Sequence, residues 1–453
     1  MRRLVEDRGG AVAVMVALSL VPLLGLVGLG VDAGRAYLVE AKLSQALDAA
    51  GLAGGRVMFE PSRDDQIRQY FAANFPDGYM GARVTPLVIS SGANDETLTV
   101  SASAQLDTGL MQLLGRRTMT VGTETQVHRA ARGMELALVM DNTGSMQSNG
   151  KIDAMKAGAT ELIDILFGER SSIPNVWVSL VPYVASVNPG PSHAGWLKAG
   201  ELAKLNYYTN GWKGCVEARL GANELTDAPP AAEKFMPYRY PKSPAPENRY
   251  PPVDESMAAN LAGGGSGPNR ACPDPITPMQ TDKAAIKAAI GRMGPWHRGG
   301  TMGHLGLLWG WSTLSPRWRG LWSAATPQLP LDYGTAYMDK VVVMLTDGNN
   351  QWSADDYTAY DRLSDGRLGT TNINTAKTRL DQRQSQVCTA LKQQGIVIYT
   401  ITVQLAAADA STRALYQGCA SKPAYYFDTS DNTQLRTSFR QIANSLSNLR
   451  LAR

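Results

Sequence analysis

The chain has 453 residues, of which 44% are hydrophobic and 19% are charged, proportions typical of globular rather than disordered proteins. Its formal net charge is +4, and no basic run concentrates that charge, so nucleic acid is not an expected partner. A chain of this length can form two or three domains and at least one large hydrophobic core.

The first predicted element is an apolar segment near the N-terminus. Residues 10–31 contain no charged side chain, and at about 1.5 Å per residue they are long enough to cross a membrane as a helix. Arg2, Arg3 and Arg8 precede the segment, which favours a cytoplasmic N-terminus. We therefore expect residues 1–31 to be a cytoplasmic tip and a transmembrane helix. A cleavable signal peptide is the alternative, although its apolar core is usually only about 7–15 residues long.

A small α+β module is predicted for residues 32–131. Apolar side chains between Tyr37 and Ala50 follow helical spacing, so we expect the helix to continue beyond the membrane until Gly54 and Gly55 end it. A short helix is expected near residues 66–74. Two strands are expected at 97–106 and 118–127, where the sequence alternates or is rich in β-branched residues.

From residue 132 onward, predicted strands and helices alternate. The expected strands are 135–140, 176–184, 339–346, 396–403 and 424–429, and the expected helices are 150–167, 282–293, 303–314, 376–394 and a final one around 435–449. This alternation is typical of an α/β domain with a mostly parallel sheet covered on both faces. A proline-rich, aromatic insertion at 188–280 interrupts the pattern, and we interpret it as a disulfide-pinned excursion that could form a partner surface.

Four cysteines are present, and they fit a compartment outside the cytoplasm. Sequence order favours two disulfides, Cys215 with Cys272 and Cys388 with Cys419, while four buried free thiols are the alternative. No two cysteines form a CxxC pair and the four histidines are scattered, so a zinc site is not expected.

Polar residues follow the predicted strands at the edge where ligands bind in open α/β sheets. The strand at 135–140 runs into Asp141, Thr143 and Ser145, and the strand at 339–346 runs into Asp347. Thr301, after two glycines, is expected to open the helix at 303–314 close to the same crevice. Two carboxylates and three hydroxyls are hard oxygen ligands, which suit Mg²⁺ or Mn²⁺. Each element alone is also compatible with an ordinary helix cap.

This residue set resembles the metal-ion-dependent adhesion site of von Willebrand factor A domains. The family's usual pattern is Asp-x-Ser-x-Ser, and Thr143 departs from it while keeping the hydroxyl. The resemblance covers about residues 132–453 and implies a doubly wound, mostly parallel sheet. It also implies that Thr143 and Ser145 ligate the metal directly, that Asp141, Thr301 and Asp347 do so directly or through water, and that an Asp or Glu carboxylate of a partner protein completes the shell.

The N-terminal segment from Arg8 to Gly55 resembles the membrane-proximal part of TadG-like proteins of the Flp/Tad pilus-assembly system. The stretches "WKGCVEAR", "ACPDPITPM" and "LWGWSTLSPRWRG" are also similar to that family's adhesion-type domain. The resemblance implies a single-pass protein of the bacterial inner membrane whose C-terminal domain is periplasmic or extracellular. Its expected role is protein binding in pilus assembly or secretion, with pilus or pilus-assembly proteins as partners and without enzymatic activity.

Two other classes of function remain open at this point. The segment "DNTGS" resembles the phosphorylation loop of haloacid-dehalogenase-like phosphoryl-transfer enzymes, in which Asp141 would be the nucleophile. However, Asn142 replaces that family's lysine, Thr143 stands where phosphatases need a second aspartate, and Thr301 has no role in the scheme. A serine hydrolase is weaker, because Ser145 lacks the Gly-x-Ser-x-Gly context. A purely structural scaffold with an incidental metal is the remaining alternative.

Overall fold

The computed structural model describes residues 8–57, 62–92, 97–128, 133–242, 248–353 and 355–451. The chain forms two compact units, Met1–Ala131 and Arg132–Arg453. Arg2 and Arg3, on which the expected membrane orientation partly rests, lie outside the described residues.

The first unit is built on one long helix, α1 (Arg8–Arg56). The stretch Val12–Gly55 contains a window long and apolar enough to cross a membrane by length and composition, and the described side chains before Asp32 are mostly exposed. Beyond Asp32 one face becomes buried, at Ala36, Val39, Leu43 and further positions three or four residues apart. This spacing places the buried side chains on one stripe of the helix. The expected continuation of the apolar helix into the module is confirmed.

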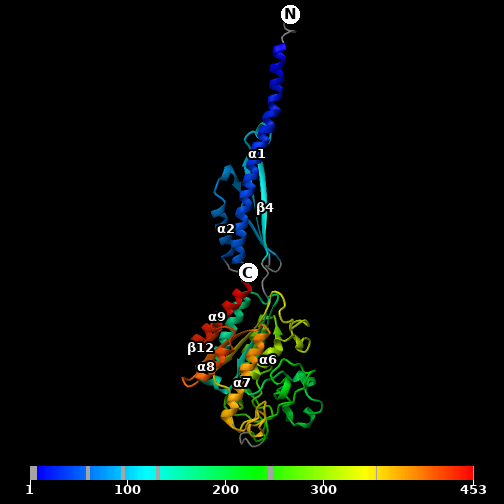
Figure 1. The fold of residues 1–453 in the computed structure, drawn as a ribbon, viewed down its shortest axis with the longest axis vertical. Coiled ribbons are helices and arrows are strands. Elements are labelled where there is room, and N and C mark those ends of the chain that lie inside the picture. The colour runs from blue at the N-terminus through cyan, green and yellow to red at the C-terminus, as the bar shows by residue number, and fades with distance from the viewer. Residues whose placement is uncertain are drawn as a thin grey trace. The chain divides into compact units, whose positions relative to one another are not determined.

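A four-stranded antiparallel sheet packs against the second half of α1 (Figure 1). Strand β3 (Thr97–Asp107) pairs along its whole length with β4 (Thr118–His128), and the short strands β1 (Arg83–Val84) and β2 (Val88–Ser91) pair with β3. Alternate residues of β3, from Leu98 to Leu106, are buried in a core shared with α1 and with helix α2 (Arg63–Asn74). The short helix and both strands expected here are present.

The second unit contains a six-stranded sheet in the order β12-β11-β9-β5-β6-β7. Its strands are β5 (Gly133–Asp141), β6 (Val176–Tyr183), β7 (Thr277–Gln280), β9 (Met338–Thr346), β11 (Val397–Val403) and β12 (Tyr426–Thr429). Five of the six strands are parallel, and β7 is antiparallel to β6 at one edge. The mostly parallel α/β sheet expected from the sequence is confirmed. Strand β7 adds an edge that the sequence did not predict.

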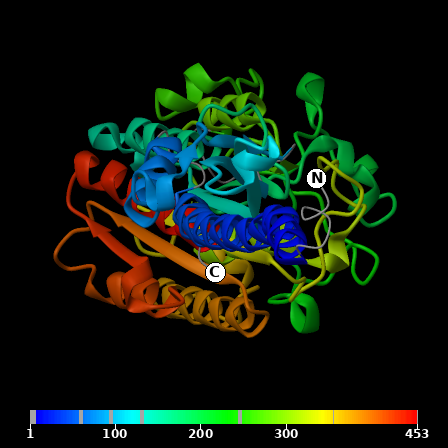
Figure 2. The same cartoon turned by 90° about the horizontal axis from the view of Figure 1, so that it is seen from above.

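Helices cover both faces of this sheet. One face carries α6 (Gly303–Leu314), α7 (Ile373–Gln393) and α8 (Ala410–Cys419), and the other carries α3 (Lys151–Phe167), α5 (Lys283–Arg292) and α9 (Asn432–Leu451). Figure 2 shows α7 and α9, in orange and red, on opposite sides of the orange strands. Strands β5 and β9 are buried along almost their whole length because they lie between these two layers.

The insertion at 188–280 is packed and not an open loop. Its described part consists mainly of short 3₁₀ turns, the five-residue helix α4 (Met257–Leu261) and the edge strand β7. Tyr207, Tyr238 and Tyr240 are buried, whereas Tyr208 is exposed. Its aromatic side chains therefore serve mostly as an internal core. This reduces the apolar surface that the insertion can offer to a partner.

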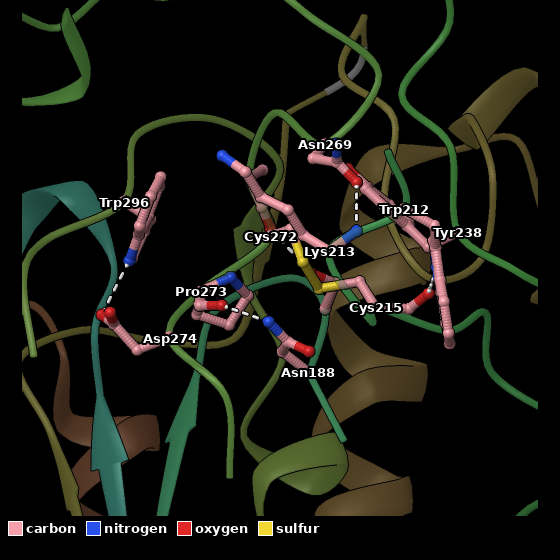
Figure 3. The surroundings of a disulfide bond; sticks show 12 residues. Asn188, Trp212, Lys213, Cys215, Tyr238, Asn269, Cys272, Pro273, Asp274 and Trp296 are labelled. Atoms are coloured by element: carbon pink, nitrogen blue, oxygen red, sulfur yellow. Dashed lines mark hydrogen bonds between the residues drawn. A yellow bond between two sulfur atoms is a disulfide. The ribbon is translucent and has the colours of Figure 1, made fainter. Parts of the chain in front are cut away.

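Two disulfides hold the second unit. Cys215 and Cys272 are joined inside the insertion (Figure 3), and Cys388 on α7 is joined to Cys419 at the end of α8. In the surroundings of the first bond, the side chain of Asn188 donates to the Pro273 carbonyl at 2.8 Å. The cysteines thus pair in sequence order, and the first disulfide joins two distant parts of the insertion.

Candidate metal centre

The candidate site begins where the central strand β5 ends. Asp141 is its last residue, and Thr143 precedes a 3₁₀ turn (Gly144–Gly150) that leads directly into α3. Strand β9 lies next to β5 in parallel register and ends one residue before Asp347. Because the carboxyl ends of neighbouring parallel strands share one edge, the two aspartates meet there.

Hydrogen bonds connect four of the five residues expected at the site. The Thr143 backbone N–H donates to Asp141 Oδ1 at 2.8 Å, and the Thr143 and Ser145 hydroxyls are 3.0 Å apart. The Ser145 hydroxyl donates to Asp347 Oδ1 at 2.7 Å. Thr346, which the sequence analysis did not single out, donates its hydroxyl to Asp141 Oδ2 at 2.7 Å. Two strands that are far apart in sequence therefore supply one continuous oxygen cluster.

The cluster combines buried carboxylates with an exposed hydroxyl. Asp141 is fully buried and Asp347 is 7% exposed, but Ser145 reaches solvent. Burial and, to a lesser extent, the nearby charge of Asp347 together raise the pKa of Asp141 to about 7. A buried carboxyl with a raised pKa beside a second carboxyl is an environment that a bound cation would stabilise.

A lysine side chain already places one positive charge beside the two carboxylates. The ammonium of Lys151, the first residue of α3, forms an ion pair with Asp347 Oδ2, and the side chains of both residues are largely buried. This contact joins residues 196 positions apart, and the sequence offered no sign of it. With Lys151, the cluster carries one net negative charge when both carboxyls are ionised.

Thr301 occupies a neighbouring position outside this network. It lies in the two-residue strand β8 (Gly300–Thr301), which pairs with β10 (Gln351–Trp352), and α6 begins two residues later. The expectation that Thr301 itself opens the helix is therefore wrong, because backbone pairing with Gln351 keeps it extended. Thr301 is buried, and in the described part of the chain its hydroxyl has no hydrogen bond to the other four residues.

The segment 294–298 and the insertion contact the loop that follows Asp141. Trp296 bridges to Thr143 through the backbone, and its indole N–H donates to Asp274 at 3.2 Å, next to the disulfide (Figure 3). His297 lies over Gly144, where an added Cβ would be 2.5 Å from the imidazole Nδ1. The His297 Nε2–H donates to Gln147 Oε1 at 2.7 Å. These contacts hold the loop after Asp141 from outside the sheet, and a side chain at position 144 would require His297 to move.

The oxygen donors fit a hard divalent cation. Among the described residues, no group of three or more His, Cys, Asp or Glu side chains is placed to hold a metal ion, so a cation here would depend on the hydroxyls as well as on the two carboxylates. Two carboxylates with neighbouring hydroxyls match the preference of Mg²⁺ and Mn²⁺ for oxygen. The raised pKa of Asp141 has burial as its largest cause and the charge of Asp347 as the second, and a cation at this place would favour the ionised carboxylate.

Comparisons with known proteins gave similar solved structures and one family match. Curated protein sequences gave no match. Among solved structures, the pilus adhesin SpaC from Lactobacillus rhamnosus GG is similar at 11% identity and a TM-score of 0.37, over 81% of this chain and 34% of that one. The von Willebrand factor domain of the type V pili tip protein Mfa5 from Porphyromonas gingivalis is similar at 10% identity and a TM-score of 0.38, over 71% of this chain and 97% of that one.

A third similar structure is proximal thread matrix protein 1 from the mussel byssus, described with a zinc-occupied MIDAS motif. It has 14% identity and a TM-score of 0.33, over 71% of this chain and 47% of that chain. The chain therefore spans about a third of SpaC and about half of the mussel protein. At the N-terminus, residues 10–57 match the family model described as "Putative Flp pilus-assembly TadE/G-like". The resemblance of the N-terminal segment to TadE/G-like pilus-assembly proteins is thus confirmed.

Proposed function

We propose that this protein is a membrane-anchored component of a Flp/Tad pilus-assembly or secretion system that binds protein partners through a Mg²⁺-dependent adhesion site. Residues 1–31 would anchor the chain in the bacterial inner membrane, residues 32–131 would form the membrane-proximal module, and 132–453 would be the binding domain outside the cytoplasm. The TadE/G-like match of residues 10–57 supports the system. The apolar helix and the two disulfides support the location.

The observation that carries the binding function is the hydrogen-bonded cluster at the carboxyl edge of β5 and β9. The two carboxylates of the cluster are buried, and Ser145, which contacts one of them, is exposed. A bound ion would therefore have protein ligands on its buried side and an accessible side that faces solvent. Thr143 and Ser145 would ligate Mg²⁺ or Mn²⁺ directly, and Asp141, Thr301 and Asp347 directly or through water. Mg²⁺ prefers six oxygens and usually keeps several waters, which leaves a position that a partner's Asp or Glu carboxylate can take.

Phosphoryl transfer on Asp141 is less consistent with the same geometry. Both carboxylate oxygens of Asp141 accept hydrogen bonds, from the Thr143 N–H and the Thr346 hydroxyl, and the side chain is fully buried. A nucleophilic carboxylate needs an oxygen that a phosphoryl group can approach, whereas a role for Asp141 in metal binding through water needs no such access. The Lys151 ammonium pairs with Asp347 instead of with Asp141. We therefore propose a binding role, without enzymatic activity.

Calorimetric titration of Mg²⁺ into the full-length protein in detergent tests the metal site. The double substitution Asp141→Ala, Ser145→Ala removes one charged and one neutral oxygen donor, so Mg²⁺ binding should be lost. Ser148→Ala is a matched control, because Ser148 is exposed in the same 3₁₀ turn and lies outside the cluster. Unchanged Mg²⁺ binding in the double variant would show that the adhesion site is assigned wrongly.

A pull-down from cells of the source organism tests the partner. Capture by the full-length protein should disappear in chelator and return with Mg²⁺ or Mn²⁺. Replacing the partner's key Asp or Glu with the isosteric amide should also abolish capture, because a neutral amide loses the charge-assisted contact with the ion. A partner whose capture ignores chelator and surface carboxylates alike would support the scaffold alternative.

A further inference from the structure

The loop between β3 and β4 is attached to α1 at the point where the uncharged segment ends. Asp32, the first charged residue after that segment, accepts hydrogen bonds from the backbone N–H groups of Gly109, Leu110 and Met111 at 2.9, 3.1 and 3.0 Å. The side chain of Asp32 is 3% exposed. Three bonds to one carboxylate hold the start of the loop against the helix and lower the pKa of Asp32, with the Met111 N–H as the largest cause.

Beyond Asp32 the same loop extends along the uncharged segment itself. A Cβ added to Gly28 would lie 2.5 Å from the Cβ of Leu110, so the loop backbone touches α1 at that level. Gly28 lies four residues before Asp32, which is about 6 Å along the helix axis. If residues 10–31 cross a membrane, this contact is at the level of the last apolar helical turn, within the boundary between lipid headgroups and acyl chains.

The chemistry of the loop suits that boundary. Residues 109–117 read Gly-Leu-Met-Gln-Leu-Leu-Gly-Arg-Arg, with four large apolar residues followed by two arginines. Leu110 is 36% exposed although it is apolar, and the side chains of Arg116 and Arg117 are exposed. Backbone hydrogen bonds from Arg116 to Met111 and from Thr108 to Arg117 close the loop into a fixed shape. Apolar side chains beside exposed basic ones are typical of segments that lie in a membrane interface.

We propose that residues 109–117 form a second membrane contact, a loop that lies in the outer interface of the same bilayer that residues 10–31 cross. Leu110 and Met111 enter the boundary of the acyl chains, and Arg116 and Arg117 contact lipid phosphates. This inference rests on the membrane anchoring in the proposed function. The occupant is a lipid surface because the exposed leucine continues the apolar surface of α1 at the level of Gly28.

A second contact changes how the module is held. The tilt and rotation of a transmembrane helix are set by packing against other helices and by anchors at the membrane interface. A module held by one helix without such anchors can therefore tilt and rotate. The Asp32 bonds fix the loop to one side of α1. Contact of that side with the lipid would give the first unit a defined orientation on the membrane.

Site-directed fluorescence in proteoliposomes tests the proposal on the full-length chain. All four cysteines form disulfides, so a single introduced cysteine can carry an environment-sensitive dye. The label is placed at Leu110→Cys in the loop, at Val88→Cys on the exposed part of β2 in the same module, and at Ser19→Cys within the apolar segment. Quenching by spin-labelled lipid and by aqueous iodide then reports the surroundings of each dye.

We expect the dyes at positions 19 and 110 to be quenched by spin-labelled lipid and protected from iodide, and the dye at 88 to behave in the opposite way. Arg116→Ala, Arg117→Ala should reduce lipid quenching at position 110 in vesicles with anionic lipid and leave position 19 unchanged. If iodide quenches the dye at position 110 but not the dye at position 19, this inference is wrong, whereas the transmembrane anchor is retained. A water-exposed dye at 19 overturns the anchor as well. Protection of position 110 only after another protein is added would assign the loop to a protein interface and also overturn the proposal.

Discussion

Lys151→Met probes whether the carboxylate cluster requires a cation. Methionine keeps a long unbranched side chain at the start of α3 and removes the ammonium that pairs with Asp347. The side chains of Lys151 and Asp347 are 10% and 0% exposed. After the substitution, Asp141 and Asp347 would lie together at the end of the two central strands without a counter-charge.

The expected cost follows from the burial of the pair. Removing one partner of a buried ion pair usually costs about 3–5 kcal/mol, because the remaining charge stays desolvated. Lys151 keeps slight contact with solvent, so we expect a loss of about 3 kcal/mol in the free energy of unfolding without metal. A divalent ion would replace the missing charge. Saturating Mg²⁺, at about 100 times its Kd, contributes about 2.7 kcal/mol, so Mg²⁺ should restore most of the loss.

Urea denaturation of the full-length protein, in chelator and in Mg²⁺, measures both effects. Lys156→Met on the same helix is the matched control, because the Lys156 ammonium bonds only to the Met293 carbonyl at 3.0 Å among the contacts described. The control should change little and should not respond to Mg²⁺. If Lys151→Met unfolds like the unmodified protein in chelator, the ion pair is not stabilising. If the variant is destabilised but Mg²⁺ restores nothing, the cluster does not attract a divalent cation.

Three further outcomes are expected from features away from the cluster. Replacing Cys388 and Cys419 with alanine should lower the free energy of unfolding by about 3–4 kcal/mol, because their disulfide closes a 31-residue loop; an unchanged urea midpoint would contradict this. Burial lowers the pKa of His304 to about 3, so the unfolded state binds the extra proton between pH 6.5 and 3, and the contribution of His304 to the free energy of unfolding should fall as the pH falls, by about 2 kcal/mol at pH 5, while the raised pKa of Asp141 acts in the opposite direction. The stability difference between the unmodified protein and His304→Gln, measured by denaturation at pH 7 and at pH 5, isolates the His304 contribution and should shift by about that amount in favour of the variant at pH 5. Gly306→Val should cost about 2–3 kcal/mol, because an added Cβ would lie 2.6 Å from the buried Tyr183 ring; calorimetry that finds no drop in Tm would contradict it.

The sequence predicted the central part of the fold because that part follows strong local patterns. The apolar run before Asp141 and the one before Asp347 read as buried strands, and the helices between strands imply that both run parallel. Their carboxyl ends then have to meet at one edge, as they do. The long helix α1 was predictable for the same reason, since its apolar periodicity extends from the uncharged segment into the module.

The remaining features depend on contacts between distant residues. Strand β7 has four residues and contains Pro278, so it carries no alternating pattern, and its pairing with β6 defines it. Thr301 is extended only because Gln351 pairs with it. Lys151 reads in sequence as an ordinary solvated residue at a helix start, and only the fold brings its ammonium to Asp347. The periodicity of a sequence predicts single helices and strands, whereas these features depend on which distant segments of the chain lie side by side.

The two ends of the six-stranded sheet have a consequence for how other proteins can attach. A partner that extends a sheet by strand addition needs a long, free edge with unpaired backbone groups. Here each edge strand has only four residues, β7 carries a proline that cannot donate a backbone hydrogen bond, and its pairing with β6 is already irregular. Neither edge of this sheet offers a long template for strand addition, which also disfavours edge-to-edge aggregation between copies of the chain. If the second unit binds proteins as proposed, a partner has to contact surfaces other than these edges, and the loops at the carboxyl ends of the strands are such a surface.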